Sequence, residues 1–241
     1  MDHRQHFYNR YTSVQSRFSS LEDARERVAT EHRGLERSIA AFLPQGKTAK
    51  VLDLGCGYGA FLLYMRDQGY VNLRGVDRSD EQVQLAKSLG LTCVENGDLF
   101  SAIATESAVD LVTMFDVIEH LTRSEAIQAL TLIHSLLETG GTLIMRTPNV
   151  DALHGTALSF GDLTHELHLN KGSVLELFAS LPYSSVEILP VQPIGGGIFT
   201  SAVRAMLSPV FTLINRCSHV VDGISWSATI KTPNMLIVAR R

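Results

Sequence analysis

Three glycines, Gly55, Gly57 and Gly59, stand between a short apolar run and a segment with helical spacing. Glycine lets the backbone turn sharply and approach a ligand closely, because it carries no Cβ atom. A strand that leads through such a turn into a helix also exposes backbone N–H groups at the start of that helix, where a flat or anionic molecule can bind. The glycines therefore predict a nucleotide-type binding site, which suits NAD and S-adenosylmethionine equally well.

Two acidic residues near this turn separate the two ligands. Asp53 ends the apolar run, where its carboxylate would repel a pyrophosphate but can hold the cationic amino group of a methionine moiety. Asp77 follows 24 residues later, at the end of the next apolar run. There it can accept hydrogen bonds from both ribose hydroxyls of either ligand. The charge of Asp53 therefore favours S-adenosylmethionine over NAD.

Five short segments, VLDLGCGYG, GVD, NGD, FDVIEH and GG, resemble in order the motifs of the class I S-adenosylmethionine-dependent methyltransferases, which have a seven-strand Rossmann-like fold. The resemblance spans residues 50–149 and implies that the glycine turn holds the methionine end, Asp77 the ribose, and Asp98 with Leu99 the adenine. The residues expected to bind this cofactor, and its product S-adenosylhomocysteine, are Asp53, Gly55, Cys56, Gly57, Asp77, Arg78, Asp98, Leu99 and Phe115. An ordinary turn at Asp98 and a solvated charge at Arg78 are the alternatives.

The run from Asp116 to His120 follows the fourth predicted strand, at the edge where open parallel sheets bind their ligands. It is similar to the acid-x-x-Glu-His sequence of the quinone-biosynthesis O-methyltransferases. This resemblance implies that Asp116, Glu119 and His120 bind a divalent metal such as Mg²⁺, for which oxygen and imidazole groups are suitable ligands. His120 as a general base, and a structural role for the whole run, are the alternatives.

Methyl transfer to a hydroxyl group requires in-line attack on the sulfonium methyl and a base that removes the hydroxyl proton. Histidine suits this task near neutral pH. His165 and His168 lie in a polar loop after the fifth predicted strand, and similar Thr-His-x-x-His segments occur in relatives that modify sugars and lipid precursors. His120, His165 and His168 are therefore the candidate catalytic residues, and a polar loop with hydrogen-bonded histidines is the alternative.

The elements that must position these residues follow a βαβ pattern from residue 50 onward. Apolar, β-branched runs predict strands at residues 50–54, 73–76, 92–95, 109–115, 141–147, 185–191 and 235–239. Helical spacing with Gly or Pro near the ends predicts helices at residues 60–68, 80–89, 124–137 and 171–181. Together with the resemblance, this pattern implies an α/β, three-layer Rossmann-like fold whose seven-stranded, mostly parallel sheet has an antiparallel last strand.

A length of 241 residues fits a single domain. We expect N-terminal helices at residues 1–45 as a lid, a core at residues 46–194 and 224–241, and a helical insertion at residues 195–223. From the lid, Arg33 either meets the methionine carboxylate or remains an exposed charge. The insertion has an apolar stripe, but polar residues and Pro209 interrupt its apolar sequence, so we do not expect it to span a membrane. It covers the substrate, forms a homodimer contact or attaches shallowly to a membrane.

The composition narrows the partners and the compartment. A net charge of −4 and a pI near 6.1 give no indication of a nucleic-acid partner. Cys56, Cys93 and Cys217 fit neither a disulfide framework nor a zinc site, and the first residues do not resemble a secretory signal. We therefore expect a cytoplasmic protein, either free or in peripheral contact with the inner membrane surface.

The predicted function is the transfer of a methyl group from S-adenosylmethionine to a hydroxyl oxygen in a biosynthetic reaction. The expected acceptor is a small molecule, namely a sugar, a glycolipid precursor or a quinone-like compound. The glycolipid precursor would be a lipid-linked saccharide. Two rival functions share the glycine turn: an NAD-dependent oxidoreductase, and a non-catalytic protein that binds the cofactor to scaffold a biosynthetic complex. The sequence contains no Tyr-x-x-x-Lys pair of the kind that short-chain dehydrogenases use, which disfavours the first rival.

Overall fold

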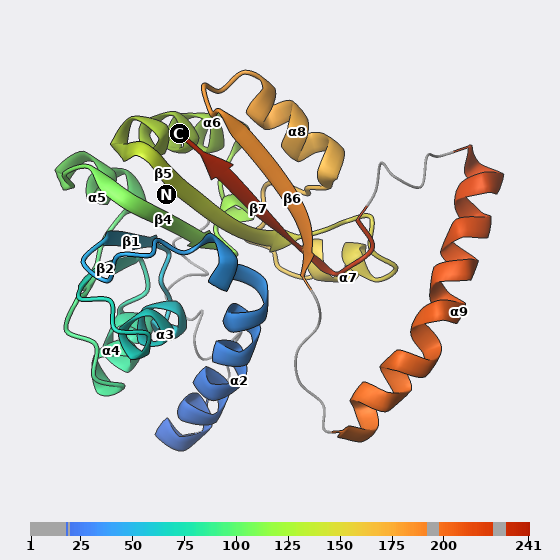
Figure 1. The fold of residues 1–241 in the computed structure, drawn as a ribbon, viewed down its shortest axis with the longest axis horizontal. Coiled ribbons are helices and arrows are strands. Elements are labelled where there is room, and N and C mark those ends of the chain that lie inside the picture. The colour runs from blue at the N-terminus through green and yellow to red at the C-terminus, as the bar shows by residue number, and fades with distance from the viewer. Residues whose placement is uncertain (1–17, 19, 192–197, 224–229) are drawn as a thin grey trace.

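The computed structural model of the protein describes residue 18 and residues 20–191, 198–223 and 230–241 (Figure 1). Residues 1–17 and 19 of the predicted lid lie outside the described part of the chain, as do residues 192–197 and 224–229 around the predicted insertion. The described part of the lid is helix α2 (Leu21–Ile39), followed by the short 3-10 helix η2 (Ala40–Phe42). The hydroxyl of Ser20 accepts a hydrogen bond from the Asp23 N–H and so caps the start of α2.

Seven strands form one sheet, as the apolar runs predict. They are β1 (Lys50–Leu54), β2 (Asn72–Asp77), β3 (Val94–Asn96), β4 (Val109–Phe115), β5 (Leu137–Pro148), β6 (Ser185–Val191) and β7 (Asn234–Arg240). Their order is β3-β2-β1-β4-β5-β7-β6. Strands β1 to β5 are parallel, and β7 runs antiparallel to both of its neighbours, β5 and β6. The expected mostly parallel sheet with an antiparallel last strand is confirmed.

Helices cover both faces of this sheet (Figure 1). The other described helical elements are α3 (Ala60–Asp67), α4 (Asp80–Ser88), α5 (Leu99–Thr105), η3 (Ile118–His120), α6 (Arg123–Leu136), α7 (Gly155–Ser159), α8 (Lys171–Ala179) and α9 (Ile198–Asp222). One apolar core includes residues of α2, α3 and α4, and the other includes residues of α5, α6 and α8. Because both faces are covered, β1 and β4 are buried along nearly their whole length. The three-layer Rossmann-like arrangement is therefore confirmed.

The sheet gathers the predicted site residues along one edge. Asp53 of β1 lies in register with Gly75 of β2 and Thr113 of β4, so the C-terminal ends of these three strands meet. The strand order changes direction between β1 and β4, because the chain runs outward from β1 to β3 and then returns to the other side of β1. Such a reversal leaves a crevice at the carboxyl ends of the strands, where open α/β sheets bind their ligands.

Several elements differ from the sequence prediction, and the short helices η3 and α7 are absent from it, as is α5. Helix α5 is absent from the prediction because its seven residues are too few to show a helical period. Strand β5 begins at Leu137, before the predicted residue 141, because a register shift in β4 lets Leu137 pair with Val109. The predicted insertion is one helix, α9, which continues through Pro209 instead of breaking there.

Candidate active site

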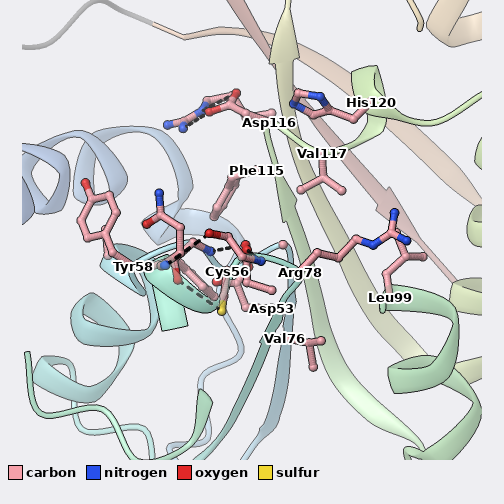
Figure 2. A pocket seen from close by; sticks show the side chains of 18 of the residues that line it. Asp53, Cys56, Tyr58, Val76, Arg78, Leu99, Phe115, Asp116, Val117 and His120 are labelled. Atoms are coloured by element: carbon pink, nitrogen blue, oxygen red, sulfur yellow. Dashed lines mark hydrogen bonds and ion pairs between the residues drawn. The ribbon is translucent and has the colours of Figure 1, made fainter. Parts of the chain in front are cut away.

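A cavity of about 510 Å³ opens at the C-terminal ends of β1, β2 and β4. This volume lies in the range of small-molecule binding sites. The cavity is lined by all nine residues that were expected to bind the cofactor: Asp53, Gly55, Cys56, Gly57, Asp77, Arg78, Asp98, Leu99 and Phe115. Figure 2 shows Arg78 and Leu99 on one side of it, and Asp116 and His120 near each other beyond Phe115. The crevice therefore brings together residues from both halves of the sheet.

The glycine turn forms one wall of the cavity, and its backbone adopts conformations that glycine takes most readily. Gly55, Gly57 and Gly59 have φ angles of 72°, 53° and 82°. A Cβ atom at Gly55 would also lie 2.3 Å from Cγ2 of Val117. The N–H of Gly57 donates a hydrogen bond to Asp77 Oδ2 at 2.8 Å. The turn is thus tied to the end of β2, which fixes where the backbone can meet a ligand.

Asp53 presents a buried carboxyl group to the cavity. Its side chain is 2% exposed, and its Oδ1 accepts a hydrogen bond from the Thr113 hydroxyl at 2.7 Å. Burial, opposed by the Thr113 hydrogen bond and aided by the charge of Asp77, raises the pKa of Asp53 to about 7. A cation that binds beside Asp53 would favour the ionised carboxylate. The group is therefore suited to hold an ammonium group.

Asp77 is held by backbone N–H groups on both of its carboxylate oxygens. Oδ2 accepts from Gly57 and Oδ1 accepts from Ser79, each at 2.8 Å. Burial raises the pKa of Asp77, while these two hydrogen bonds lower it. Each carboxylate oxygen has a second lone pair, which can accept a ribose hydroxyl. Asp77 is thus oriented by the turn it supports.

Asp98 and Arg78 combine a structural position with a place in the cavity wall. Oδ1 of Asp98 accepts hydrogen bonds from the N–H groups of Phe100 and Ser101, at 2.9 and 3.3 Å, and so caps α5. Arg78 is exposed, and its Nε lies 3.8 Å from Asp98 Oδ2. Asp98 therefore has the structural role, and Arg78 the exposed charge, that the alternative interpretations give them. Both residues also line the cavity beside Leu99.

Helix α2 also lines the cavity, with side chains that the sequence analysis did not single out. Arg27, Glu31 and Leu35 follow one another at intervals of four residues and share one face of the helix. Glu31 Oε1 accepts hydrogen bonds from Arg27 Nε at 2.9 Å and from the Tyr58 hydroxyl at 2.6 Å. Arg33 lies on another face, where it is exposed, as the alternative interpretation of this residue states.

Asp116 is ion-paired with Arg146 at the end of β5. Its φ of 56° is unusual for a residue other than glycine and turns the chain after β4. The Nε of Arg146 lies 3.1 Å from both carboxylate oxygens, and Nη2 also donates to Oδ2. The guanidinium lies over the ring of Phe115, 5.5 Å from its centroid. This ion pair forms the wall of the cavity next to Phe115.

His120 lines the cavity, and the loop after β5 fixes its ring. The Thr164 hydroxyl oxygen lies 2.8 Å from His120 Nδ1 and 2.6 Å from Asp162 Oδ1. Because a carboxylate only accepts, the hydroxyl donates to Asp162 and accepts the proton of Nδ1. The lone pair of His120 is then on Nε2. Burial, together with the charge of His165, lowers the pKa of His120 to about 4, so the imidazole is neutral near pH 7.

The same loop brings His165 against His120. The two ring centroids are 4.7 Å apart, and His165 Nδ1 lies 2.7 Å from the Ser159 carbonyl oxygen. Since a carbonyl only accepts, Nδ1 carries the proton and the lone pair of His165 is on Nε2. His168 is exposed and stacks on Phe160, with centroids 3.7 Å apart. Of the three candidate histidines, the structure therefore brings His120 and His165 into ring contact, whereas His168 is exposed and its Nδ1 lies 2.8 Å from the Ser159 hydroxyl oxygen.

Comparisons with known proteins decide the family. The family model described as a methyltransferase domain matches residues 24–187, more than half of the chain. The chain belongs to this methyltransferase family. The methyltransferase is 24% identical over 204 residues to ajmaline N-methyltransferase of Rauvolfia serpentina, which covers 77% of this chain and 68% of that enzyme. It is 26% identical over 146 residues to malonyl-[acyl-carrier protein] O-methyltransferase of Erwinia billingiae, which covers 58% of this chain and 57% of that enzyme.

Solved structures share the fold of this methyltransferase. A SAM-dependent methyltransferase from Archaeoglobus fulgidus superimposes with a TM-score of 0.64 at 19% identity, over 100% of both chains. Phosphoethanolamine N-methyltransferase 2 of Haemonchus contortus, solved in complex with S-adenosyl-L-methionine, superimposes with a TM-score of 0.60 at 13% identity over 97% of this chain and 60% of that one. The family membership makes the protein an S-adenosylmethionine-dependent methyltransferase and replaces the NAD-dependent alternative.

The structure changes the group of residues that could hold a metal in this methyltransferase. Among the described residues, Glu119, His120 and His165 bring one ligand atom each within 4.8 Å of one another, and Asp116 is not part of this group. Glu119 Oε2 accepts from the Thr147 hydroxyl at 3.0 Å, whereas Oε1 has no hydrogen-bond partner in the described part of the chain. One carboxylate and two imidazoles fit a divalent transition metal better than Mg²⁺. His165 therefore takes the place that the sequence analysis gave to Asp116.

The residues that sequence analysis missed in this methyltransferase are those whose positions depend on packing between distant segments. They include Arg27, Glu31, Arg146, Asp162 and Thr164. The spacing of Arg27 and Glu31 gives a weak signal, because residues four apart share a helix face. For Arg146, a basic side chain near the C-terminal end of a predicted strand is a comparable signal.

Proposed function

We propose that the protein transfers the methyl group of S-adenosylmethionine to a hydroxyl oxygen of a small molecule. A sugar, a glycolipid precursor or a quinone-like compound is the acceptor in this proposal. The observation that carries it is the position of His120, which lines the cavity with its lone pair on Nε2 while Thr164 and Asp162 hold the Nδ1 proton. A hydroxyl nucleophile must lose its proton during the reaction, and a neutral imidazole at the site can accept it.

The proposed reaction is a single displacement. The acceptor oxygen attacks the methyl carbon in line with the carbon–sulfur bond, so the new carbon–oxygen bond forms as that bond breaks. The electron pair stays on sulfur and gives S-adenosylhomocysteine, and the hydroxyl proton moves to His120 Nε2. Asp162 then stabilises the imidazolium through Thr164.

The remaining cavity residues position the donor in this proposal. Asp53 holds the ammonium group of the methionine moiety, and Asp77 accepts hydrogen bonds from the ribose. Helix α2 acts as the described part of the lid, because Arg27, Glu31 and Leu35 face the cavity. Such positioning is the main contribution a protein makes to a transfer between two bound groups.

Family membership alone leaves oxygen and nitrogen acceptors open. One relative is named for N-methylation of ajmaline and the other for O-methylation of a malonyl group on an acyl-carrier protein. Oxygen is favoured here because a hydroxyl requires a proton acceptor at the reacting atom, whereas a neutral amine attacks with its own lone pair.

A divalent cation bound by Glu119, His120 and His165 is a second candidate role for the same residues. The buried Glu119 Oε1, without a hydrogen-bond partner among the described residues, favours it. Such an ion would act as a Lewis acid that lowers the pKa of an acceptor hydroxyl. The lone pairs on Nε2 of both histidines would then serve as ligands, while the hydrogen bonds to Thr164 and Ser159 orient the rings.

The test combines a methyl-transfer assay with a metal analysis. The purified protein is incubated with methyl-labelled S-adenosylmethionine and a panel of sugars, lipid-linked saccharides, catechols and amines, and the methylated atom is identified by NMR. We expect transfer to a hydroxyl, and we expect His120→Gln to lower kcat by about 10²–10⁴-fold with an unchanged Kd for the cofactor. The matched control is His154→Gln, because His154 is exposed at the start of α7 and lies outside the cavity lining.

Two results would contradict the proposal. Transfer to amines alone, or full activity of His120→Gln, would remove the basis for a hydroxyl acceptor. Bound metal detected by mass spectrometry, together with loss of activity on dialysis against EDTA and recovery on adding Zn²⁺ or Mn²⁺, would favour the cation over the proton acceptor.

A further inference from the structure

Helix α9 (Ile198–Asp222) is a long amphipathic helix that the rest of the described protein leaves uncovered. Figure 1 shows it standing apart from the sheet and from the helices that cover it. Its large apolar side chains are more than half exposed at Phe199, Met206, Val210, Leu213, Ile214 and Val221. A helix of this kind gains most of its stability by burying its apolar face. The exposed stripe therefore requires a partner surface.

The charges on α9 indicate the chemistry of that partner. Helix α9 contains two arginines, Arg204 and Arg216, and one acidic residue, Asp222 at its last position, whereas the whole chain has a net charge of −4. At 100° per residue, the apolar side chains lie on one side of the helix and Ser208, Thr212 and Asn215 on the other, with the arginines on either flank of this polar face. Arginines in this position can reach phosphate groups while the apolar face lies in a lipid layer.

A second copy of the helix fits this surface less well. Pairing two copies through the apolar stripes would place four arginines beside the seam against two acidic residues, so the arginines could not all meet opposite charges across the pair. The length of 25 residues, roughly 37 Å at 1.5 Å per residue, also exceeds what is needed to cover a cavity of about 510 Å³. An anionic lipid surface matches both the length and the charge of α9.

The topology connects α9 to the active site. The helix lies between β6 and β7, and Val191 at the end of β6 pairs with Asn234 at the start of β7. Asn234 also pairs with Pro148 at the C-terminal end of β5. The insertion therefore leaves and rejoins the sheet at the edge where the cavity opens. A surface that binds α9 would lie close to that edge.

We propose that α9 lies flat in the surface of a bilayer that contains anionic phospholipids, and that it brings the active-site edge to a lipid-linked acceptor. The second half of this proposal rests on the proposed function. Among the described residues, no helix has the length and apolar content required to cross a membrane. A helix in the plane of the interface needs only one apolar face, which is what α9 has.

Vesicle co-sedimentation of the full chain tests the docking. We expect binding to vesicles of phosphatidylcholine mixed with phosphatidylglycerol, weaker binding to phosphatidylcholine alone, and a decrease with rising salt. The double variant Met206→Ser/Leu213→Ser should reduce the partition coefficient at least ten-fold. Arg204→Gln and Arg216→Gln should each reduce it about five-fold on the anionic vesicles only. The matched control is Val71→Ser/Leu175→Ser, which changes exposed apolar residues elsewhere and should bind as the wild type does.

Three outcomes would overturn the docking. They are failure to bind anionic vesicles, conversion of a dimer to a monomer by Met206→Ser/Leu213→Ser in light scattering, and a weaker Kd for S-adenosylmethionine in that variant. The second would assign the stripe to another copy and the third to a cover for the cavity. Vesicle binding by a protein that transfers methyl groups only to amines would leave the docking intact and contradict the proposed function alone.

Discussion

Asp53 should couple the binding of S-adenosylmethionine to the release of a proton. In the protein without cofactor, burial raises the pKa of Asp53 to about 7, so the carboxyl group is about half protonated at pH 7. A bound ammonium group favours the ionised form, and the protonated form must lose its proton first. Because the pKa of Asp53 is raised in the protein without cofactor, the affinity for S-adenosylmethionine is highest above pH 7 and falls as the pH drops below this value.

The size of the effect follows from the fraction of Asp53 that is ionised. For a pKa of about 7, the apparent Kd should be about five-fold weaker at pH 6 and about 16-fold weaker at pH 5.5 than at pH 7. At pH 6.5, binding should release about 0.7 proton, since the amino group of the ligand, with a pKa near 7.7–8.0, is almost fully charged there. The range from pH 5.5 to 7 therefore isolates the protein carboxyl from the ligand amine.

Isothermal titration calorimetry in two buffers with different ionisation enthalpies measures this proton release. The matched control is Asp53→Asn, which keeps the shape and can still accept the Thr113 hydrogen bond but cannot titrate. We expect this variant to bind more weakly at pH 7, with a Kd that is constant from pH 5.5 to 7. A wild-type Kd that stays within two-fold over this range, with no dependence on the buffer, would refute the reasoning.

Two further predictions concern the loop after β5. Thr164→Val removes the hydroxyl that accepts the Nδ1 proton of His120, so kcat should fall about ten-fold, and Thr164→Ser should restore it. Methyl-transfer kinetics measure kcat, and calorimetry measures the Kd for the cofactor, which should not change. Equal losses of kcat in the two variants would indicate a packing effect instead. Gly155→Ala places a Cβ atom 2.0 Å from the Asn149 carbonyl oxygen and should lower the free energy of unfolding by about 1–3 kcal/mol in urea titrations. Gly46→Ala, where no atom lies within 4 Å of the added Cβ, should leave it nearly unchanged, and similar values for both variants would contradict the clash.

The sequence predicts the donor half of the site because each residue in it has a fixed relation to a strand end. Asp53 and Asp77 end their strands, and the carboxyl ends of parallel strands meet at one edge. The glycine turn has a conformation that the chemistry of glycine itself permits. These residues line one cavity, and local sequence is enough to predict them. The family resemblance indicates the same residues.

The proposed acceptor half depends on contacts that no local pattern encodes. His165 and His168 stand three residues apart in a loop without periodicity, and only packing on η3 turns the first toward His120 and leaves the second on the surface. Asp116 follows a strand end as Asp53 does, but its backbone conformation and the distant Arg146 draw it into an ion pair. Side-chain partners far apart in the sequence thus decide which candidate residues share a site.

Helix α9 shows the same division between sequence and structure. Its apolar stripe and its flanking arginines are visible in the sequence, because helical periodicity is local. Whether that stripe is buried depends on the surfaces that the fold places next to it, and the structure leaves its apolar side chains exposed. The sequence by itself determined the fold class and the methyl donor through strand ends, glycines and charges. Only the tertiary structure decided which histidines meet and which apolar face remains uncovered, since both depend on long-range packing.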